Sequence, residues 1–293
     1  MAVIRNRLEK EIFEFSIFPP NFLSLNFTTM KTNEFLSILD NPNLIEGIYN
    51  YCDRWCERCP MTTRCSVFLT TPKLEPEDFE NEEAFLKAMM DSMSDSFQIS
   101  MDLLQQVAEE ENIDLSEANE DESFTEQMEA MHEEIECSPL SLLSLEYLDL
   151  SADWLKTAGP DIKSLGDNLQ RTALMGLPDS NPQEDALALK NALENITYYL
   201  RQIHVKVIRA QTGHIRSDGW FEENDFPKDS DGSAKVALIG IDRSIDAWGV
   251  MLPHLPDHEE SILTMLSKLQ QLRNLVEDAF PDARSFRRPG FDD

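Results

Sequence analysis

The stretch EDALALKNALENITYYLRQIHVKVIRAQT, residues 184–212, decides the fold class. Its large aliphatic residues recur at alternating intervals of four and three positions: Leu189, Leu193, Ile196, Leu200, Ile203 and Val207. Residues with this spacing lie on one face of an α-helix. A narrow apolar seam of this kind packs against neighbouring helices. We therefore expect a helix here that forms part of a bundle.

The segment that follows predicts a central helix. Residues 233–252 are apolar almost all round the helix, with a cap expected at Ser233 and a close approach of a neighbour expected at Gly240. Asp242 and Asp246 interrupt the apolar character. Since buried charges need partners, we expect Arg209 of the preceding helix to pair with one of them.

Further helices are predicted over about 33–59, with a break near Asn41-Pro42, and over about 81–111, 138–156 and 257–279. The helix at 138–156 opens with Ser138-Pro139, a capping residue followed by a proline in the first turn. The aromatic stretch 13–27, broken by Pro19-Pro20, is expected to be an extended arm. There is no β-α-β alternation. The economical architecture is all-α: an antiparallel helical bundle with an N-terminal Cys-rich helical hairpin and an acidic segment with a mobile or solvated character.

The predicted organisation has three parts within one globular unit. Residues 1–75 form an arm and the Cys-rich helical hairpin, 76–137 form a long helix and the acidic segment, and 138–293 form the bundle core. The composition agrees with helices, because 41% of the 293 residues are hydrophobic and only 10 are glycine.

The chain is strongly acidic, with a formal net charge of −30. Between Lys87 and Lys156 there is no lysine or arginine, while 19 acidic residues fall in that interval. Such a chain repels nucleic-acid phosphates and anionic membranes. Residues 1–18 lack the continuous apolar core of a signal peptide, and no apolar run is long enough to span a bilayer. We expect a cytoplasmic protein with no nucleic-acid or membrane partner.

Four of the five cysteines fall within fourteen residues, in the run YCDRWCERCPMTTRC: Cys52, Cys56, Cys59 and Cys65. In a reducing compartment, clustered thiols indicate a metal site rather than disulfides. If the predicted helix continues through Cys59, the first three share one face, and Cys65 closes a four-sulfur site from beyond a turn. Interleaved arginines would offset the negative charge of four thiolates, and Trp55 would shield the site from water.

Three interpretations of this cluster remain open. The first is an iron–sulfur cluster (4Fe-4S), which several thiolates on one short segment commonly hold. The second is structural zinc, although only Cys56 and Cys59 have the Cys-x-x-Cys spacing of zinc knuckles. The third is four reduced thiols that act as small apolar side chains.

Two resemblances accompany the cysteine run. Its first three cysteines have the spacing found in radical S-adenosylmethionine enzymes, which look like (β/α) barrels, whereas here the motif follows a predicted helix. The run YCDRWCERCP, with ITYYLRQIHVKVIRA and GSAKVALIGIDRSIDAW, resembles a group of uncharacterised bacterial helical proteins over about residues 45–255. That resemblance implies no activity.

A bundle enzyme is the remaining alternative. Glu194, His204 and Asp242 are the candidate catalytic residues across a bundle core, although a structural role for each is the simpler interpretation. Whether the chain is an enzyme stays open from the sequence. The leading functional hypothesis is a redox or sensing role through the cluster, with an unidentified protein partner. The alternative is an interaction module stapled by zinc, and homo-oligomerisation is compatible with both.

Overall fold

The computed structural model describes residues 32–71, 82–113, 122–175, 181–217 and 229–292. Within these ranges the regular structure is helical, without a strand. The expected all-α class is therefore confirmed. The chain divides into two compact units: Met1–Leu44 with Pro60–Asn119, and Ile45–Cys59 with Glu120–Asp293. We refer to these as the first unit and the second unit and describe each by itself.

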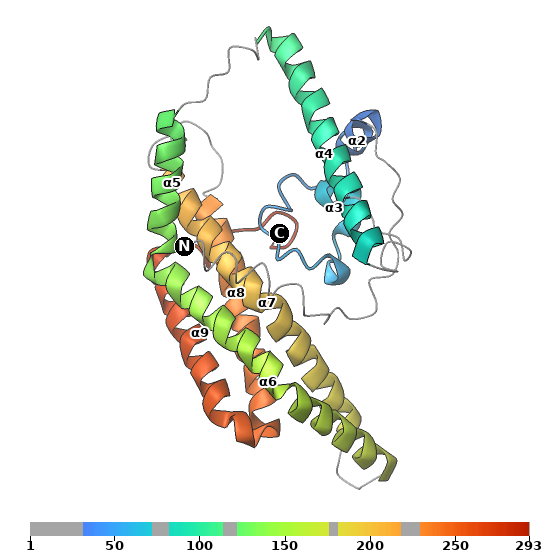
Figure 1. Cartoon of the computed structure of the whole chain (residues 1–293), viewed down its shortest axis with the longest axis vertical. Helices are drawn as coiled ribbons and strands as arrows, with labels where there is room; N and C mark the ends of the chain where they lie inside the picture. The colour runs from blue at the N-terminus through green and yellow to red at the C-terminus, as the bar shows by residue number, and fades with distance from the viewer. Residues whose placement is uncertain (1–31, 72–81, 114–121, 176–180, 218–228, 293) are drawn as a thin grey trace. The chain divides into compact units, whose positions relative to one another are not determined.

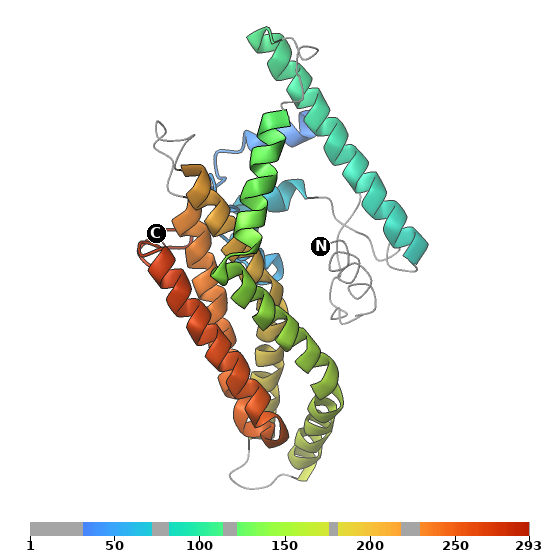
Figure 2. The same ribbon diagram turned by 60° about the vertical axis from the view of Figure 1, so that its left-hand side comes forward.

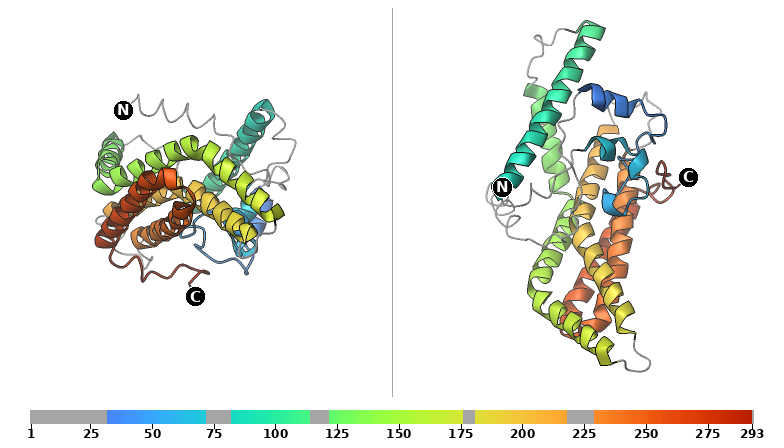
Figure 3. Two further views of the ribbon diagram at one scale, coloured as in Figure 1. Left: turned by 90° about the horizontal axis from the view of Figure 1, so that it is seen from below. Right: turned by 90° about the vertical axis from the view of Figure 1, so that its right-hand side faces the viewer.

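The second unit is built on a bundle of four long helices (Figures 1 and 2). These are α6 (Pro139–Met175), α7 (Pro182–Ser217), α8 (Asp229–Met251) and α9 (Glu259–Ala279). Each helix contacts the next in sequence, and α9 also contacts α6, so the four helices close a ring around one core. The view from below in Figure 3 shows the four helices grouped together. The shorter α5 (Glu122–Glu136) packs on α7 and α6.

The apolar seam of α7 forms the centre of this core. Five of its six residues are buried: Leu189, Ile196, Leu200, Ile203 and Val207. The sixth, Leu193, is half-buried. Across from the seam, α8 is buried along most of its length, as its all-round apolar sequence predicts. The prediction of a central helix is confirmed.

Gly240 permits the close packing of α8 on α7. A Cβ at this position would lie 3.0 Å from atoms of both Ile203 and Tyr199. Any larger residue would therefore push the two helices apart or displace these side chains.

The start of α6 agrees with the capping prediction. The Ser141 backbone N–H donates to Ser138 Oγ at 3.1 Å, and Pro139 opens the helix. The helix continues past the predicted end near Lys156 to Met175 and contains Pro160.

The predicted ion pair between Arg209 and Asp242 or Asp246 is wrong. Arg209 pairs with Asp229 at 2.9 Å. The reason is that α8 begins at Asp229 rather than at Ser233, which brings an acidic first turn next to Arg209. Asp242 instead pairs with Arg273 and Arg284, at 3.5 and 2.5 Å.

The first unit contains α2 (Thr32–Leu39), the single turn η2 (Thr62–Arg64), α3 (Ser66–Thr70) and the long α4 (Glu82–Glu111). Within it, α2 contacts both α3 and α4. Thr32 Oγ1 donates to Asp102 Oδ2 at 2.7 Å and ties the start of α2 to α4. The predicted long helix over about 81–111 is confirmed.

The predicted break near Asn41-Pro42 is confirmed, but the predicted helix does not resume over 43–59, so the Cys-rich segment is not a regular helical hairpin. The chain leaves the helix at an Asx turn, in which the Asn43 N–H donates to Asn41 Oδ1 at 3.0 Å, and Pro42 lacks a donor for helix continuation. Gly47 and Arg54 then adopt left-handed conformations, with φ of 69° and 63°. The cysteines consequently do not share one helical face.

One expected segment lies wholly outside the residues that the structure describes, and another lies partly outside them. The predicted arm at 13–27 lies outside the described residues. In the acidic segment, residues 114–121 lie outside them, while Glu122–Glu136 form α5. Among the helices that the structure describes, none combines the length and the apolarity needed to cross a bilayer.

Candidate functional site

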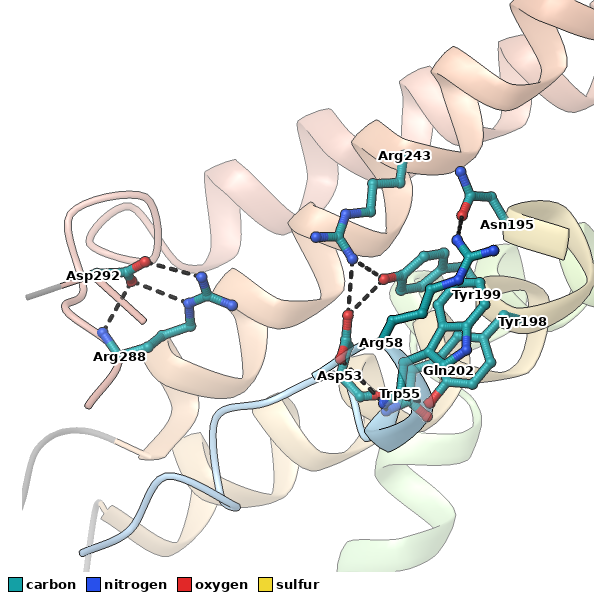
Figure 4. A network of polar contacts seen from close by, with 10 residues as sticks. All are labelled: Asp53, Trp55, Arg58, Asn195, Tyr198, Tyr199, Gln202, Arg243, Arg288 and Asp292. Carbon is teal, nitrogen blue, oxygen red and sulfur yellow. Dashed lines mark hydrogen bonds and ion pairs between the residues drawn. The ribbon is translucent and has the colours of Figure 1, made fainter. Parts of the chain in front are cut away.

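The segment Ile45–Cys59 carries three of the clustered cysteines and belongs to the second unit. Asp53 is its principal attachment to the bundle (Figure 4). The Asp53 carboxylate accepts a hydrogen bond from the Tyr199 hydroxyl at 2.6 Å and forms an ion pair with Arg243 at 2.9 Å. Arg243 also donates to the Tyr199 hydroxyl, so the three groups form a closed triangle. One carboxylate thus joins the segment to α7 and α8 together.

The backbone of Asp53 is held as firmly as its side chain. Its carbonyl oxygen accepts hydrogen bonds from the Tyr198 hydroxyl at 2.7 Å and from Gln202 Nε2 at 2.8 Å. Tyr198 and Gln202 are four residues apart on α7 and therefore lie on the same face. These two donors take the place of the water that a loop carbonyl oxygen would otherwise bind. This local order supports the left-handed conformation of Arg54, the next residue.

Trp55 adds an apolar contact next to this polar one. Its ring stacks on Tyr198 with centroids 4.1 Å apart and an interplanar angle of 12°. The guanidinium of Arg58 lies 4.0 Å from the Trp55 centroid, in cation–π geometry. Arg58 also forms an ion pair with Glu194 and a hydrogen bond of 3.4 Å with Asn195, both on α7. Aromatic stacking and charge thus fix the segment immediately before Cys59.

The cysteines of this segment lie in irregular backbone. Cys52 is half-buried, and its Sγ contacts the Tyr49 carbonyl oxygen at 3.6 Å. Burial raises the pKa of the Cys52 thiol, although Arg54 and Lys206 act in the opposite direction. Cys56–Arg58 form the single 3₁₀ turn η1, and the Cys59 N–H donates to the Cys56 carbonyl at 3.1 Å. Cys56 and Cys59 therefore lie at the two ends of one tight turn.

The other two cysteines do not belong to this segment. Cys65 precedes α3 in the first unit, where its N–H donates to the Thr62 carbonyl at 3.3 Å. Cys137 is exposed after α5. All five cysteines are thiols in the structure. Among the described residues, no three His, Cys, Asp or Glu side chains are already grouped as ligands of a metal ion. Ligation by the clustered cysteines would therefore require their side chains to converge when metal binds.

Lys206 is a buried cation next to the Cys-bearing segment. Its side chain lies on α7 with the residue only 3% exposed, and Nζ is 3.4 Å from the Asn50 carbonyl oxygen. Burial, together with a smaller effect of the neighbouring Arg209, lowers the pKa of Lys206 to about 8. The positive charge of Lys206 therefore destabilises the folded chain.

The structure gives the three candidate catalytic residues separate surroundings. Glu194 pairs with Arg58, and Asp242 pairs with Arg273 and Arg284. His204 Nδ1 lies 2.8 Å from Ser144 Oγ, and burial lowers the pKa of His204. Ten residues of helix separate Glu194 from His204, about 15 Å along the axis. The contacts of the described residues therefore give no support for a shared catalytic centre of these three.

Several residues that position the Cys-bearing segment escaped the sequence analysis. Asp53, Tyr199, Gln202 and Arg243 act together, yet up to 190 residues separate them along the chain. Asp53 lies between two cysteines of the motif, which is a local signal that could have drawn attention to it. Nothing in the local sequence indicates that Arg243 is its partner.

Comparisons with known proteins identify no relative of this chain. No family model matches the chain, and neither the curated proteins nor the solved structures contain a match.

Proposed function

We propose that this protein binds one metal centre through Cys52, Cys56, Cys59 and Cys65, and that the centre is an iron–sulfur cluster with a redox or sensing role. The observation that carries the proposal is the attachment of the Cys-bearing segment to the bundle. Asp53, located one residue after Cys52 and three before Cys56, takes part in four polar contacts with α7 and α8.

This attachment is what a metal-binding loop requires. Ligands bind metal well when neighbouring groups restrict the loop that carries them. Here the restricting groups come from the long helices α7 and α8 of the bundle. A loop that served only as a connection would not need two tyrosines, a glutamine and an arginine to hold one residue.

The charges around Cys52 bear on ligation as well. Burial holds the pKa of this thiol above its usual value, and Arg54 and Lys206 offset that effect only in part. Metal binding would release the proton from this thiol, so affinity should rise with pH through the alkaline range. The convergence of the side chains would be coupled to metal binding.

Structural zinc is the second candidate, and one observation favours it. The tight turn from Cys56 to Cys59, closed by an N–H to carbonyl hydrogen bond, resembles the Cys-x-x-Cys turns that present two thiolates to zinc. In that case the protein would be an interaction module whose metal stabilises the fold.

The test is elemental analysis with an absorption spectrum on the full chain purified without oxygen. For the cluster we expect iron with an equivalent amount of acid-labile sulfide and visible absorption, all lost in a Cys56→Ser/Cys59→Ser variant. The matched control is Cys137→Ser, which removes an exposed thiol outside the motif and should retain the metal.

Zinc at one equivalent per chain, without visible absorption, would contradict the iron–sulfur cluster and support structural zinc. A chain that retains neither iron nor zinc, and takes up neither after reconstitution with iron and sulfide or with zinc, would contradict both. Metal that persists in the double variant at the level of the control would show that the cysteines are not the ligands.

A further inference from the structure

The long helix α4 of the first unit presents an exposed apolar stripe. Eight large apolar side chains are exposed along it: Leu86, Met89, Met90, Met93, Phe97, Met101, Leu104 and Val107. With about 100° between successive residues, all eight fall within about 120° of arc on one side of the helix. Met90, Met93 and Phe97 are 65%, 59% and 68% exposed. Contiguous apolar surfaces of this kind on a soluble chain are covered by a partner.

We propose that the segment 13–27 of this same chain covers the stripe. Residues 13–27, FEFSIFPPNFLSLNF, contain five phenylalanines, two leucines and one isoleucine but only one charged residue, Glu14. Exposing these side chains to water is as unfavourable as exposing those of the stripe. Packing the two against each other would remove both from water. Pro19-Pro20 in its middle favours an extended conformation, which can follow the length of a helix.

The connection to α2 brings this segment to the right place. The chain enters α2 at Thr32, which is hydrogen-bonded to Asp102 of α4. Met101, at the edge of the stripe, is the neighbour of Asp102 in sequence and lies about 100° round the helix from it. The four residues 28–31 reach about 13 Å when extended, comparable to the helix diameter of about 10–12 Å. They are therefore long enough to lead from Asp102 to the stripe.

The lengths agree as well. From Leu86 to Val107 the stripe extends about 32 Å along the axis. Fifteen extended residues span up to about 50 Å, so 13–27 can run from Met101 past Met93 and Met90 to Leu86, about 22 Å along the axis, with slack for the two prolines. Attachment at Thr32 gives the segment an effective concentration of about millimolar at the stripe, an advantage that no separate partner has.

Charge distinguishes this occupant from a second copy of α4. The helix carries eight acidic residues and one lysine, so pairing two copies would bring two strongly negative surfaces together. Residues 1–31 carry four basic and three acidic residues and add no net negative charge to the helix. The charge balance thus favours the segment over self-association through this face.

Methionine oxidation tests the proposal on the full chain. Hydrogen peroxide converts accessible methionines to sulfoxides, and mass spectrometry gives the rate at each site. Met175, 69% exposed on α6, is the control for an uncovered methionine, and the buried Met251 and Met265 report that the fold stays intact. If the segment covers the stripe about 90% of the time, Met90 and Met93 should oxidise about tenfold more slowly than Met175.

A matched pair of variants identifies the occupant. Phe15→Ser/Phe18→Ser/Phe22→Ser should raise the oxidation rates of Met90 and Met93 to within about twofold of Met175, because the segment loses its apolar anchors. The same three positions changed to leucine should keep the protection. Met251 and Met265 should stay protected in both variants.

Three outcomes would overturn the proposal. The first is oxidation of Met90 and Met93 at the rate of Met175 in the unaltered chain. The second is protection that the serine variant leaves unchanged. The third is protection that disappears on dilution together with a dimer detected by light scattering, which would assign the stripe to a second copy.

Discussion

Asp53 shows how much of the candidate site depends on one residue. Its carboxylate and its carbonyl oxygen together bind Tyr198, Tyr199, Gln202 and Arg243. Two of these contacts depend on the negative charge, and two depend only on where the backbone lies. A substitution that keeps the shape of the side chain but removes its charge therefore separates the two contributions.

We expect Asp53→Asn to lower the free energy of unfolding by about 1–2 kcal/mol, because it weakens charge-assisted hydrogen bonds to Tyr199 and Arg243 in a half-buried setting. Urea denaturation followed by circular dichroism measures the change. Asp153→Asn is the matched control, since Asp153 has a side chain 76% exposed and pairs with Lys156 three residues later. Equal effects of the two substitutions would show that Asp53 does not anchor the segment.

Lys206 makes the stability of the second unit depend on pH. Its pKa is about 8 in the folded chain and 10.5 for an ordinary lysine, so between these values the unfolded chain binds more protons. The contribution of Lys206 to stability therefore rises with pH across that window, and below it the buried charge costs of the order of 3 kcal/mol. The titratable groups around it are Arg209, Cys52, Arg54 and Asp229.

Lys206→Met removes this charge and keeps the length of the side chain. We expect the variant to be about 1–3 kcal/mol more stable than the unaltered chain at pH 7, with a difference that shrinks between pH 8 and pH 10. Lys190→Met, an exposed position on the same helix, is the control and should leave the pH dependence unchanged. Parallel stability curves for Lys206→Met and the unaltered chain would contradict a buried charge at this position.

At the scale of the element, the decisive contact is where the Cys-bearing segment packs on the start of α8. Gly232 lies there without a side chain, and a Cβ would come within 2.3 Å of the Tyr51 ring and 2.9 Å of the Phe286 ring. Tyr51 and Phe286 pack on each other with centroids 4.8 Å apart. A single methyl group at Gly232 would therefore displace both rings.

Gly232→Ala should lower the free energy of unfolding by about 1–3 kcal/mol through overpacking. Gly249→Ala is its matched control in the same helix, because a Cβ there meets no atom within 4 Å. The control should be neutral or stabilising by up to about 1 kcal/mol, since alanine favours helix more than glycine does. Thermal melts of both variants test the pair, and a tolerated Gly232→Ala would mean that Tyr51 does not pack there.

The comparison of sequence and structure also belongs to this scale. The seam of α7, the all-apolar α8 and the Ser138-Pro139 start of α6 were predictable, because periodicity and capping are local properties. The path of 45–59 was not, because it depends on an Asx turn, two left-handed residues and partners more than a hundred residues away. The four cysteines could be identified from their spacing, but the residues that hold three of them in place could not.

At the scale of the whole molecule, the net charge of −30 opposes compaction. We expect the melting temperature to rise with sodium chloride between about 20 and 300 mM, because salt screens repulsion between surface carboxylates. Differential scanning calorimetry at pH 7 measures the rise. The same series at pH 5, closer to the isoelectric point of 4.4, should give a smaller increase. A melting temperature independent of salt at pH 7 would show that repulsion is already compensated.

The stack of Trp55 on Tyr198 has a consequence for how this protein can be observed. An indole ring held parallel to a phenol and edge-on to Tyr199 is an asymmetric group of coupled chromophores. It should contribute to the near-ultraviolet circular dichroism only while the segment lies on the bundle. Trp154 and Trp248 form a second, edge-on pair inside the core and report on the bundle instead. The difference spectrum between the unaltered chain and Trp55→Phe would isolate the first signal, so release of the segment could be followed optically, without a label, while the bundle stays folded.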